Sequence, residues 1–100
     1  MNHVILFRDR NFAGAHKHVF GPNPNLASDR REPWDNQTSS IVVLGGQRVF
    51  YRDPDYQFVD GTLGPGLYPW VEAVGIKNDD ISSLRPIYTY GATLDELLGS

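Results

Sequence analysis

An internal repeat limits the folds open to this chain more than any other feature of the sequence. The segment FRDRNF at residues 7–12 aligns with YRDPDY at 51–56, and DNQTSS at 35–40 aligns with NDDISS at 78–83. The offsets between the copies are 44 and 43 residues. Two copies are too few to close a propeller, but two β repeats that each expose an apolar face can pack face to face. The repeat therefore predicts a two-sheet sandwich with pseudo-twofold symmetry.

Short segments rich in β-branched and aromatic residues lie between turn-forming residues along the chain, as is typical of strands. We expect strands at residues 4–7, 18–20, 41–44, 48–51 and 81–87. Residues 21–25 and 64–66 contain Pro and Gly, which interrupt regular elements, so we expect loops there. In the tail, Thr93 and Glu96 have the spacing of a capping box, which predicts a short helix or a frayed end.

The composition favours an all-β protein with many turns. Nine of the twelve acidic residues are Asp, and six Asn, ten Gly and seven Pro add to the residues that favour turns over helix interiors. The length of 100 residues is that of one domain. We expect a single domain at residues 1–88, with a first repeat at about 3–44, a second repeat at about 47–87 and a tail at 89–100.

Charge and cysteine content exclude several classes of function. The chain has no cysteine, which excludes disulfides, thiolate metal sites and cysteine proteases. Its net charge of −3 provides no basic field for nucleic acid. No apolar run approaches the ~20 residues that span a bilayer, and the first residues lack the pattern of a signal peptide. We therefore expect a soluble monomer that binds neither nucleic acid nor membrane.

The aromatic and glycine residues that precede the repeated serine motif resemble the pattern of a known family. Phe7, Phe12 and Gly14 come before the first copy of Asp/Asn-Asp/Asn-x-x-Ser/Thr-Ser, and the combination resembles the Greek key motif of the βγ-crystallin superfamily. The resemblance covers both halves, about residues 3–87, and is strongest toward the microbial, calcium-binding members. Residues 63–83 are especially similar to an archaeal member. This resemblance implies an all-β, two-sheet Greek key β-sandwich of the βγ-crystallin type.

Side chains that carry oxygen are clustered within six residues in each copy of the serine motif. Calcium is a hard cation that takes about six to eight oxygen ligands, so these clusters suit calcium better than a softer metal. A single cluster of this kind is more typical of a plain turn, because Asp, Asn and Ser also bond their own backbone. The duplication of the cluster favours a metal site.

The family resemblance implies two calcium ions per chain, each shared between the repeats, with binding that chiefly stabilises the fold. One site would take the carbonyl of Arg8, the side chain of Asn36, the carbonyl of Asp80 and the hydroxyl of Ser82. The other would take the carbonyl of Arg52, the side chain of Asp79, the carbonyl of Gln37 and the hydroxyl of Ser39. The first residues of the two motifs, Asp35 and Asn78, would orient the loops. Such a domain would serve as a calcium-responsive structural or stress-related module.

Three residues depart from the family pattern. Phe58 stands where Gly14 stands in the first repeat, and a bulky residue tolerates a positive φ poorly, so we expect a remodelled second hairpin. Arg8 and Arg52 stand where better-known members often carry an acidic residue, so we expect weakened affinity for calcium.

Packing explains the aromatic residues. We expect the core and the hairpin corners to contain Phe7, Phe12, Tyr51 and Tyr56. Trp34 and Trp70 each precede a loop, and we expect both to be partly exposed.

Two alternatives to calcium binding stay open. One is an interaction protein, such as a toxin-like or protease-inhibiting relative of the same fold, with residues 21–25 or the loops of Trp34 and Trp70 as its contact surface. The other is a crystallin-type domain that has lost calcium, although the serine ligands Ser39 and Ser82 are both present.

Motifs of other sites are incomplete. Residues 53–64 begin like an EF-hand loop, but Phe58 replaces the glycine of the sixth position and Gly64 the glutamate of the twelfth. His16 and His18 share one face of a strand, an arrangement that can bind zinc or nickel, but no third ligand is near in the sequence. This pair predicts adventitious metal binding at most. No catalytic triad, phosphate-binding glycine loop or isolated carboxylate pair is evident, so we do not expect an enzyme.

Overall fold

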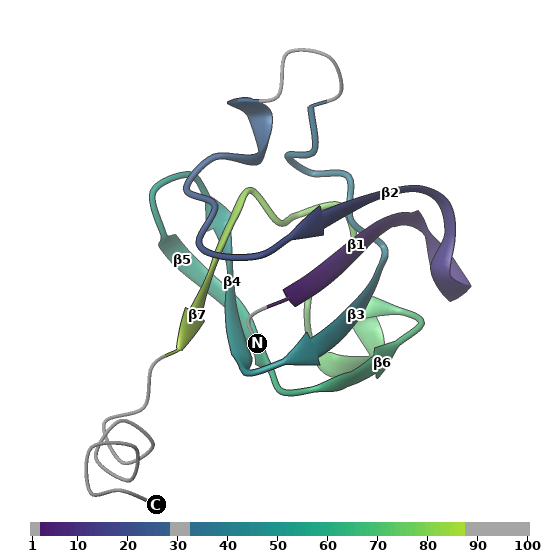
Figure 1. Ribbon diagram of the computed structural model, residues 1–100. Coiled ribbons are helices and arrows are strands. Elements are labelled where there is room, and N and C mark those ends of the chain that lie inside the picture. The colour runs from purple at the N-terminus through teal and green to yellow at the C-terminus, as the bar shows by residue number, and fades with distance from the viewer. Residues whose placement is uncertain (1–2, 29–32, 88–100) are drawn as a thin grey trace, which may run out of the picture.

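The computed structural model describes residues 3–28 and 33–87 of the chain (Figure 1). Within these ranges, the strands are β1 (His3–Asp9), β2 (Ala13–Val19), β3 (Ser40–Gly45), β4 (Gln47–Asp53), β5 (Gln57–Leu63), β6 (Gly66–Tyr68) and β7 (Ser83–Ile87). The helices are short 3-10 turns: η1 (Arg10–Phe12), η2 (Leu26–Ser28) and η3 (Val71–Val74). None of these helices has the length and apolar character that a membrane crossing needs. The all-β prediction is confirmed, and the predicted helix or frayed end at 89–100 lies outside the described residues.

The strands form two antiparallel sheets that share one core, as predicted for a sandwich (Figure 1). The first sheet has the order β2-β1-β3-β6 and the second has the order β5-β4-β7. β6 belongs to the second repeat but pairs with β3 of the first. In the reverse sense, Asn23 of the first repeat forms an isolated bridge with Leu84 of β7. Each sheet therefore includes a segment of the other repeat, and the repeats interlock in a Greek key.

Alternate residues of the strands fill the space between the sheets. In β1, Val4 and Leu6 are fully buried, while His3, Ile5 and Phe7 are partly exposed on the opposite face, as the period of a strand requires. The core cluster consists of Val4, Leu6, Val19, Leu26, Trp34, Ile41, Val43, Phe50, Leu63, Val71, Ile76, Ile81 and Leu84. Burial of these apolar side chains is the main favourable term in folding.

The two tryptophans have different environments. Trp34 is a core residue with 1% of its surface exposed, so the prediction of a partly exposed Trp34 is wrong. The backbone N–H of Trp34 donates to the carbonyl of Leu26 at 2.8 Å, which ties this segment to another residue of the core. Trp70 is half-buried, and the guanidinium carbon of Arg10 lies 4.4 Å from its ring centroid. Of the two, Trp70 alone has surface that a partner can contact.

The hairpins of the two repeats fold over in the same way. Phe12 and Tyr56 both have a left-handed backbone, with φ of 59° and 61°. Each packs edge to face on an aromatic residue of the preceding strand: the ring centroids are 5.6 Å apart for Phe7 and Phe12, and 5.5 Å apart for Tyr51 and Tyr56. These aromatics form the hairpin corners as predicted. Only Tyr51 of the four is buried, and none joins the core cluster.

The backbone of the second hairpin is not remodelled at Phe58, although the register shift lies between Phe50 and Tyr51 there and between Phe7 and Asp9 in the first hairpin. Phe58 has a φ of 60°, in the same left-handed region as Gly14 with 77°. Its side chain is 63% exposed, and the guanidinium carbon of Arg52 lies 4.7 Å from its ring centroid. A left-handed backbone costs a residue with a Cβ atom about 1–2 kcal/mol. The remaining contacts of the hairpin therefore impose this conformation on Phe58 against its local preference.

Two strands escaped the sequence analysis. β5 contains Asp60 and Gly61, residue types that are depleted in strands, yet it pairs with β4. Gly66, expected in a loop, begins β6 and pairs with Val43. Pairing with a neighbouring strand overrides local preference at both places. The last strand begins at Ser83 and not at residue 81, because the two preceding residues belong to the motif loop.

Candidate metal centre

The two copies of the serine motif form loops that bond to each other. Asn36 and Asp79, the second residues of the motifs, have φ of 56° and 57°, a left-handed conformation that Asn and Asp adopt more readily than most residues. The N–H of Asn36 donates to the carbonyl of Ile81 at 2.9 Å, and the N–H of Asp79 donates to the carbonyl of Thr38 at 3.2 Å. The loops of the two repeats are thus joined reciprocally.

Side-chain oxygens of opposite repeats meet in two equivalent pairs. The hydroxyl Oγ of Ser82 lies 3.4 Å from Oδ1 of Asn36, and the hydroxyl Oγ of Ser39 lies 3.4 Å from Oδ1 of Asp79. These distances are long for O–H···O hydrogen bonds, which are usually about 2.5–3.0 Å. Two oxygens at about 2.3–2.6 Å from one calcium ion, and at right angles, are about 3.3–3.7 Å apart. Both pairs therefore have the separation of neighbouring ligands on a shared ion.

Burial distinguishes the members of each pair. Ser39 and Ser82 are buried, with 5% and 4% exposed, whereas Asn36 and Asp79 are exposed. Each pair consequently joins a buried serine to a residue exposed at the surface. An ion between them would be open to water, which supplies part of the coordination shell in many calcium sites.

The second serine of each motif has a structural role that the sequence analysis missed. The buried hydroxyl of Ser40 donates to the carbonyl of Asp9 at 2.6 Å and accepts the N–H of Phe12 at 3.0 Å. Ser83 repeats this arrangement in the second repeat, with 2.6 Å to the carbonyl of Asp53. Each second serine therefore fixes the hairpin to the loop of its own repeat. The repeated Ser-Ser dipeptide was the available signal, but only its first serine received a role.

Four of the predicted ligands are backbone carbonyls, at Arg8, Arg52, Gln37 and Asp80. Arg8 follows Phe7, whose carbonyl accepts the N–H of Ser39, and Arg52 follows Tyr51, whose carbonyl accepts the N–H of Ser82, both at 2.9 Å. The two hairpin segments thus lie beside the loops. The assignment of each carbonyl to one of the two oxygen pairs stays a prediction.

The arginine side chains of the hairpins pack on aromatic rings. The guanidinium carbon of Arg8 lies 5.0 Å from the ring centroid of Trp34, and its Nη2 donates to the carbonyl of Pro33 at 3.2 Å. Arg52 packs on Phe58 and lies 4.0 Å from a carboxylate oxygen of Asp53. Both cations are therefore held by neighbours in the hairpin regions.

The first residues of the motifs, predicted to orient the loops, differ in their contacts. The amide nitrogen Nδ2 of Asn78 donates to Oδ2 of Asp79 at 3.3 Å, and its backbone N–H donates to Glu72 at 3.1 Å. Asp35 is half-buried at the equivalent position of the first loop.

Among the described residues, the buried oxygens Oδ1 of Asn78 and Oγ1 of Thr38 have no hydrogen-bond partner. Buried oxygens without a donor are costly unless water or an ion satisfies them.

A pair of carboxyl groups beside the second loop was also missed. Burial, a side-chain hydrogen bond with Asp80 and the negative charge of Asp80 together raise the pKa of Asp60 to about 7, whereas the charges of Arg52 and Lys77 act in the opposite direction. Asp60 comes from β5 and Asp80 from the motif loop, so only the folded chain brings them together. The second loop therefore carries more negative charge than the first.

Larger clusters of carboxylates and imidazoles are absent from the described parts of the chain. In residues 3–28 and 33–87, no group of three or more His, Asp or Glu side chains is placed to hold an ion. An ion between the loops would depend on hydroxyl, amide and carbonyl oxygens as well, which is the donor set that calcium accepts.

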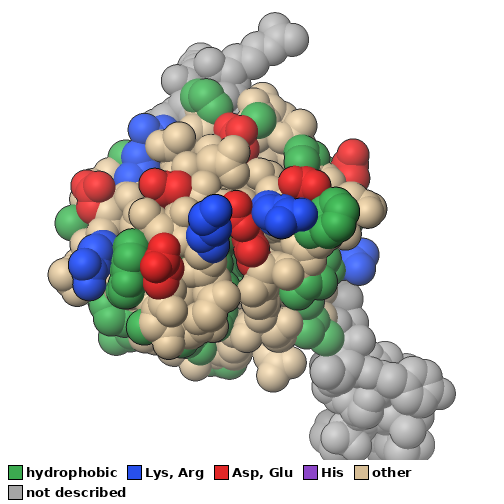
Figure 2. Space-filling view, turned by 180° about the vertical axis from the view of Figure 1, so that it is seen from behind, with side chains coloured by type: hydrophobic (Ala, Val, Ile, Leu, Met, Phe, Trp, Pro, Cys, Tyr) green, Lys and Arg blue, Asp and Glu red, His purple; other side chains and the backbone are tan. Residues whose placement is uncertain are grey.

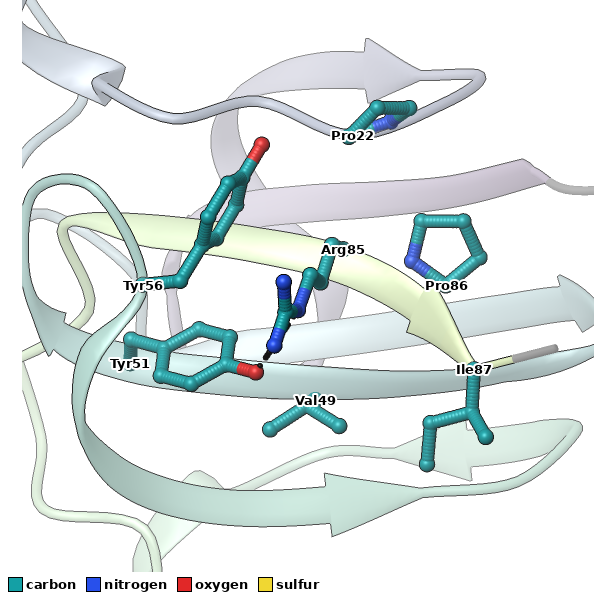
Figure 3. A pocket seen from close by; sticks show the side chains of 7 residues that line it. All are labelled: Pro22, Val49, Tyr51, Tyr56, Arg85, Pro86 and Ile87. Atoms are coloured by element: carbon teal, nitrogen blue, oxygen red, sulfur yellow. Dashed lines mark hydrogen bonds between the residues drawn. The ribbon is translucent and has the colours of Figure 1, made fainter. Parts of the chain in front are cut away.

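A pocket of about 530 Å³ lies on the second sheet, with Arg85 at its centre (Figure 3). The guanidinium carbon of Arg85 is 4.8 Å from the ring centroid of Tyr56, and its Nε donates to the hydroxyl of Tyr51 at 2.9 Å. The pocket is lined by Pro22, Val49, Tyr51, Tyr56, Arg85, Pro86 and Ile87. Pro22 belongs to the Pro-rich segment that the sequence suggests as a contact surface.

Charges of both signs are interspersed on the surface. Figure 2 shows acidic and basic side chains alternating across one face of the molecule, with apolar side chains between them. This face offers no extended surface of a single sign, which strong binding to a polyanion would need.

Comparison with known proteins gives a consistent result. The family model described as Beta/Gamma crystallin matches residues 3–87. The chain is 36% identical over 87 residues to beta/gamma crystallin domain-containing protein 1 of Homo sapiens, covering 85% of this chain and 4% of that protein. It is 34% identical over 90 residues to gamma-crystallin M2 of Chiloscyllium indicum, covering 90% of this chain and 48% of that protein. The chain thus spans less than half the length of both relatives.

Solved structures include similar folds of almost the same extent. A betagamma-crystallin from an archaeon has a TM-score of 0.77 and 32% identity, covering 86% of this chain and 98% of that chain. A transition-metal-ion-binding betagamma-crystallin from Methanosaeta thermophila has a TM-score of 0.72 and 34% identity, covering 84% of this chain and 99% of that chain. The part of this chain that they cover therefore corresponds to nearly all of each of those chains.

Proposed function

The chain belongs to the beta/gamma crystallin family, and from this premise we propose that it is a calcium-binding domain of the microbial type, with two Ca²⁺ ions shared between its repeats. The proposal rests on the two pairs of oxygens, Ser82 with Asn36 and Ser39 with Asp79, each 3.4 Å apart. Equal spacing in two equivalent places is expected of a duplicated ligand site.

The donor set supports calcium over softer metals. Each pair combines a hydroxyl with an amide or carboxylate oxygen, and all of these are hard ligands. In our proposal the carbonyl of Asp80 contributes to the site of Ser82, and that of Gln37 to the site of Ser39. Because Ser82 is bonded to Tyr51 and Ser39 to Phe7, we assign the hairpin carbonyl of Arg52 to the site of Ser82 and that of Arg8 to the site of Ser39, the reverse of the pairing expected from the sequence. When bound, the ion would supply a positive charge that holds the two loops together. Exposed Asn36 and Asp79 leave room for water ligands.

Binding at these places would be expressed as stability. Each oxygen pair joins a residue of one repeat to a residue of the other, so the complete site exists only in the folded chain. Free calcium at 100 times the dissociation constant of one site stabilises the fold by about 2.7 kcal/mol. For a domain of this size, each kcal/mol raises the melting temperature by roughly 4–8 °C. One occupied site would then raise it by about ten degrees or more, and the second site would add to this rise.

Thermal unfolding in calcium and in chelator tests the proposal. We expect a rise of about ten degrees or more in millimolar calcium, with a smaller effect of magnesium, which prefers shorter bonds and a stricter geometry. Titration calorimetry should give two ions per chain with dissociation constants of about 10⁻⁶ to 10⁻⁴ M. Equal melting temperatures in calcium and in chelator, together with no heat of binding at millimolar calcium, would contradict it.

A second candidate function is a protein-interaction module, and the pocket around Arg85 favours it. The pocket combines apolar walls with one cation and two tyrosines, groups that are enriched at interfaces. Pro22 places it beside the Pro-rich segment 21–25. If calcium left the melting temperature unchanged, this candidate would take the lead. Arg85→Ala should then abolish capture of the partner.

A further inference from the structure

Two histidines meet on the outer face of the first sheet, at the end of β1 that is remote from the motif loops. In the antiparallel register, Ile5 is opposite His18 and Val4 is opposite Val19, so His3 is a diagonal neighbour of His18. The side chains close this diagonal: Nε2 of His3 lies 2.9 Å from Nδ1 of His18. His3 comes from a different strand, so the two histidines are distant in the sequence.

An aromatic side chain holds the two imidazoles in place. Phe20 stacks on His3 with the ring centroids 4.3 Å apart and on His18 with the centroids 6.2 Å apart. Phe20 is itself 62% exposed, so this contact is at the surface. The rings of His3 and His18 are thereby restricted before any ligand arrives, which reduces the entropy lost on binding.

We propose that His3 and His18 form a two-imidazole site for a divalent transition metal ion. Imidazole nitrogens bind such ions at about 2.0–2.1 Å, so two of them at right angles on one ion are about 2.9 Å apart. The observed 2.9 Å between Nε2 of His3 and Nδ1 of His18 is the length of a hydrogen bond, with the ring centroids 5.1 Å apart, so the nitrogens are close enough for one ion once the rings turn their lone pairs toward it. In the metal-free hydrogen bond one of these nitrogens carries a proton. A change of tautomer moves that proton to the other nitrogen of its ring, and both facing nitrogens become lone-pair donors.

The third histidine supplies an internal comparison. His16 lies on the same face of β2, and its ring meets that of His18 edge to face, with the centroids 5.2 Å apart. It also packs against Phe7, with the centroids 5.7 Å apart. His16 therefore packs beside the proposed site and is not one of its ligands. Water or other small ligands would occupy the remaining positions on the ion.

The imidazole site is separate from the proposed calcium sites in place and in chemistry. His3 and Arg8 lie at opposite ends of β1, roughly 16 Å apart along the strand. Nitrogen ligands suit copper, nickel and zinc, whereas calcium takes oxygen. The affinity should follow the usual order of these ions, with copper above nickel and zinc, and nickel above cobalt. Failure of one proposal would leave the other standing.

Titration of the chain without a histidine tag tests the site. Nickel chloride is added at about pH 7.5, where imidazole is largely neutral, in the presence of excess calcium, and the heat of binding is recorded. We expect one Ni²⁺ per chain. His3→Gln and His18→Gln should each weaken binding by at least about tenfold, since one imidazole alone binds poorly. His16→Gln, on the same strand and face, is the matched control and should change affinity less than about twofold.

Three outcomes would overturn the site. The first is nickel binding that is unchanged in both His3→Gln and His18→Gln. The second is a loss in His16→Gln as large as that in His18→Gln, which would move the chelate to the β2 pair. The third is displacement of nickel by calcium, which would place the ion in the oxygen loops. Circular dichroism of each variant shows that the fold is intact, and zinc with nitrogen-15 spectra of the imidazoles shows directly which rings bind.

Discussion

The two repeats share one backbone but carry different chemistry at aligned positions. Asn36 of the first loop and Asp79 of the second have φ of 56° and 57°, yet one side chain is neutral and the other is a carboxylate. Gly14 and Phe58 occupy the same left-handed region of the two hairpins. The groups that fix this geometry are backbone amides and the paired serines, which are the same in both repeats. The comparison teaches that shape is set by the shared groups, whereas charge and strain are set by the positions that vary.

The largest expected effect is the loss of one of the two calcium ions, together with the stability that it adds. Replacing Ser39 or Ser82 by Arg puts a cation where the ion would lie, so each variant should bind one calcium fewer. Ser39 faces the carboxylate of Asp79, and we therefore expect Ser39→Arg to remove the larger share of the calcium-dependent rise in melting temperature. The loss of one site held at 100 times its dissociation constant is worth about 2.7 kcal/mol. Calorimetry of the unfolding transition, with calcium and with chelator, measures this.

Both serines are buried, so an alanine variant is needed to separate loss of a ligand from overpacking. Ser39→Ala and Ser82→Ala should melt close to the parent in chelator but gain less from calcium. Ser28→Ala, at an exposed position outside the loops, is the control and should retain the full gain. Two ions bound with unchanged affinity in either Arg variant would show that the ligand assignment is wrong.

Removing or adding one carboxylate should make the two sites alike. Asp79→Asn removes the carboxylate that distinguishes the second pair, and we expect the affinity of that site to fall about tenfold, or about 1.4 kcal/mol. Asn36→Asp should raise the affinity of the first site by a similar factor. Calcium titrations should therefore resolve two unequal sites in the parent and two similar, weak sites in Asp79→Asn. Identical isotherms for parent and variant would mean that Asp79 is not a ligand.

The hairpin comparison predicts opposite effects of opposite substitutions. Phe58→Gly should stabilise the fold by about 1 kcal/mol, because glycine has no penalty at positive φ. Gly14→Ala should destabilise it, since the added Cβ atom would meet the carboxylate of Asp9 in addition to the strained φ of 77°. Thermal melts in chelator measure both changes.

Phe58→Ala is the control for the hairpin variants, because it removes the ring and its contact with Arg52 but keeps the Cβ atom. The stability of Phe58→Gly relative to Phe58→Ala isolates the backbone term. If alanine were as stable as glycine at this position, the left-handed conformation would carry no cost here.

The smallest expected effect concerns pH. The pKa of Asp60 is raised to about 7, from a value near 3.9 in an unfolded chain. Folding therefore takes up a proton between about pH 4 and pH 7, and the free energy of unfolding falls as pH rises through this range. Asp60→Asn should remove that loss. The free energy of unfolding of the variant, relative to that of the parent, should therefore rise from about pH 5 to pH 8. Solvent screens this half-exposed group, and the gain should be less than about 1 kcal/mol.

Melts of parent and variant across this pH range, in chelator, check the sign. Asp55→Asn, in the exposed part of the second hairpin, serves as the control and should give a profile parallel to that of the parent. The contradicting outcome is that the stabilities of the parent and of Asp60→Asn change by the same amount between about pH 5 and pH 7. Asp60 would then not hold a proton in the folded state.

The sequence predicted the architecture because the repeat is carried by residues with local meaning. The serine motif is rich in residues that favour turns, and its duplication together with that of the hairpin aromatics Phe12 and Tyr56 implied the two-sheet sandwich. β5 and β6 escaped because Gly61 and Gly66 oppose strand formation locally, and only their pairing partners favour it. Trp34 was misplaced because a loop position says nothing about the direction of the side chain.

The residues of the candidate site were predictable from the spacing of the motif, but the two oxygen pairs that the structure brings together were predicted only through the family resemblance. Spacing within one motif drew attention to Asn36 and Ser39, but these two residues belong to different oxygen pairs, and the pairing depends on how the repeats face each other. The same reason hid His3 from His18 and Asp60 from Asp80. In each case the partner is distant in the sequence, and no local pattern encodes the distance between them.

The exchange of segments between the sheets has a consequence for the origin of the chain. Each repeat supplies one edge segment to the sheet of the other and half of each oxygen pair, so a lone repeat would leave both an unpaired sheet edge and two incomplete sites. An ancestor with one repeat would have needed a second copy of itself, arranged about a true twofold axis, to satisfy them. Duplication of such a gene would place both halves in one chain and free them to diverge. Residues 3–45 and 47–87, expressed as separate fragments, should accordingly recover the fold by complementation and should remain unfolded apart.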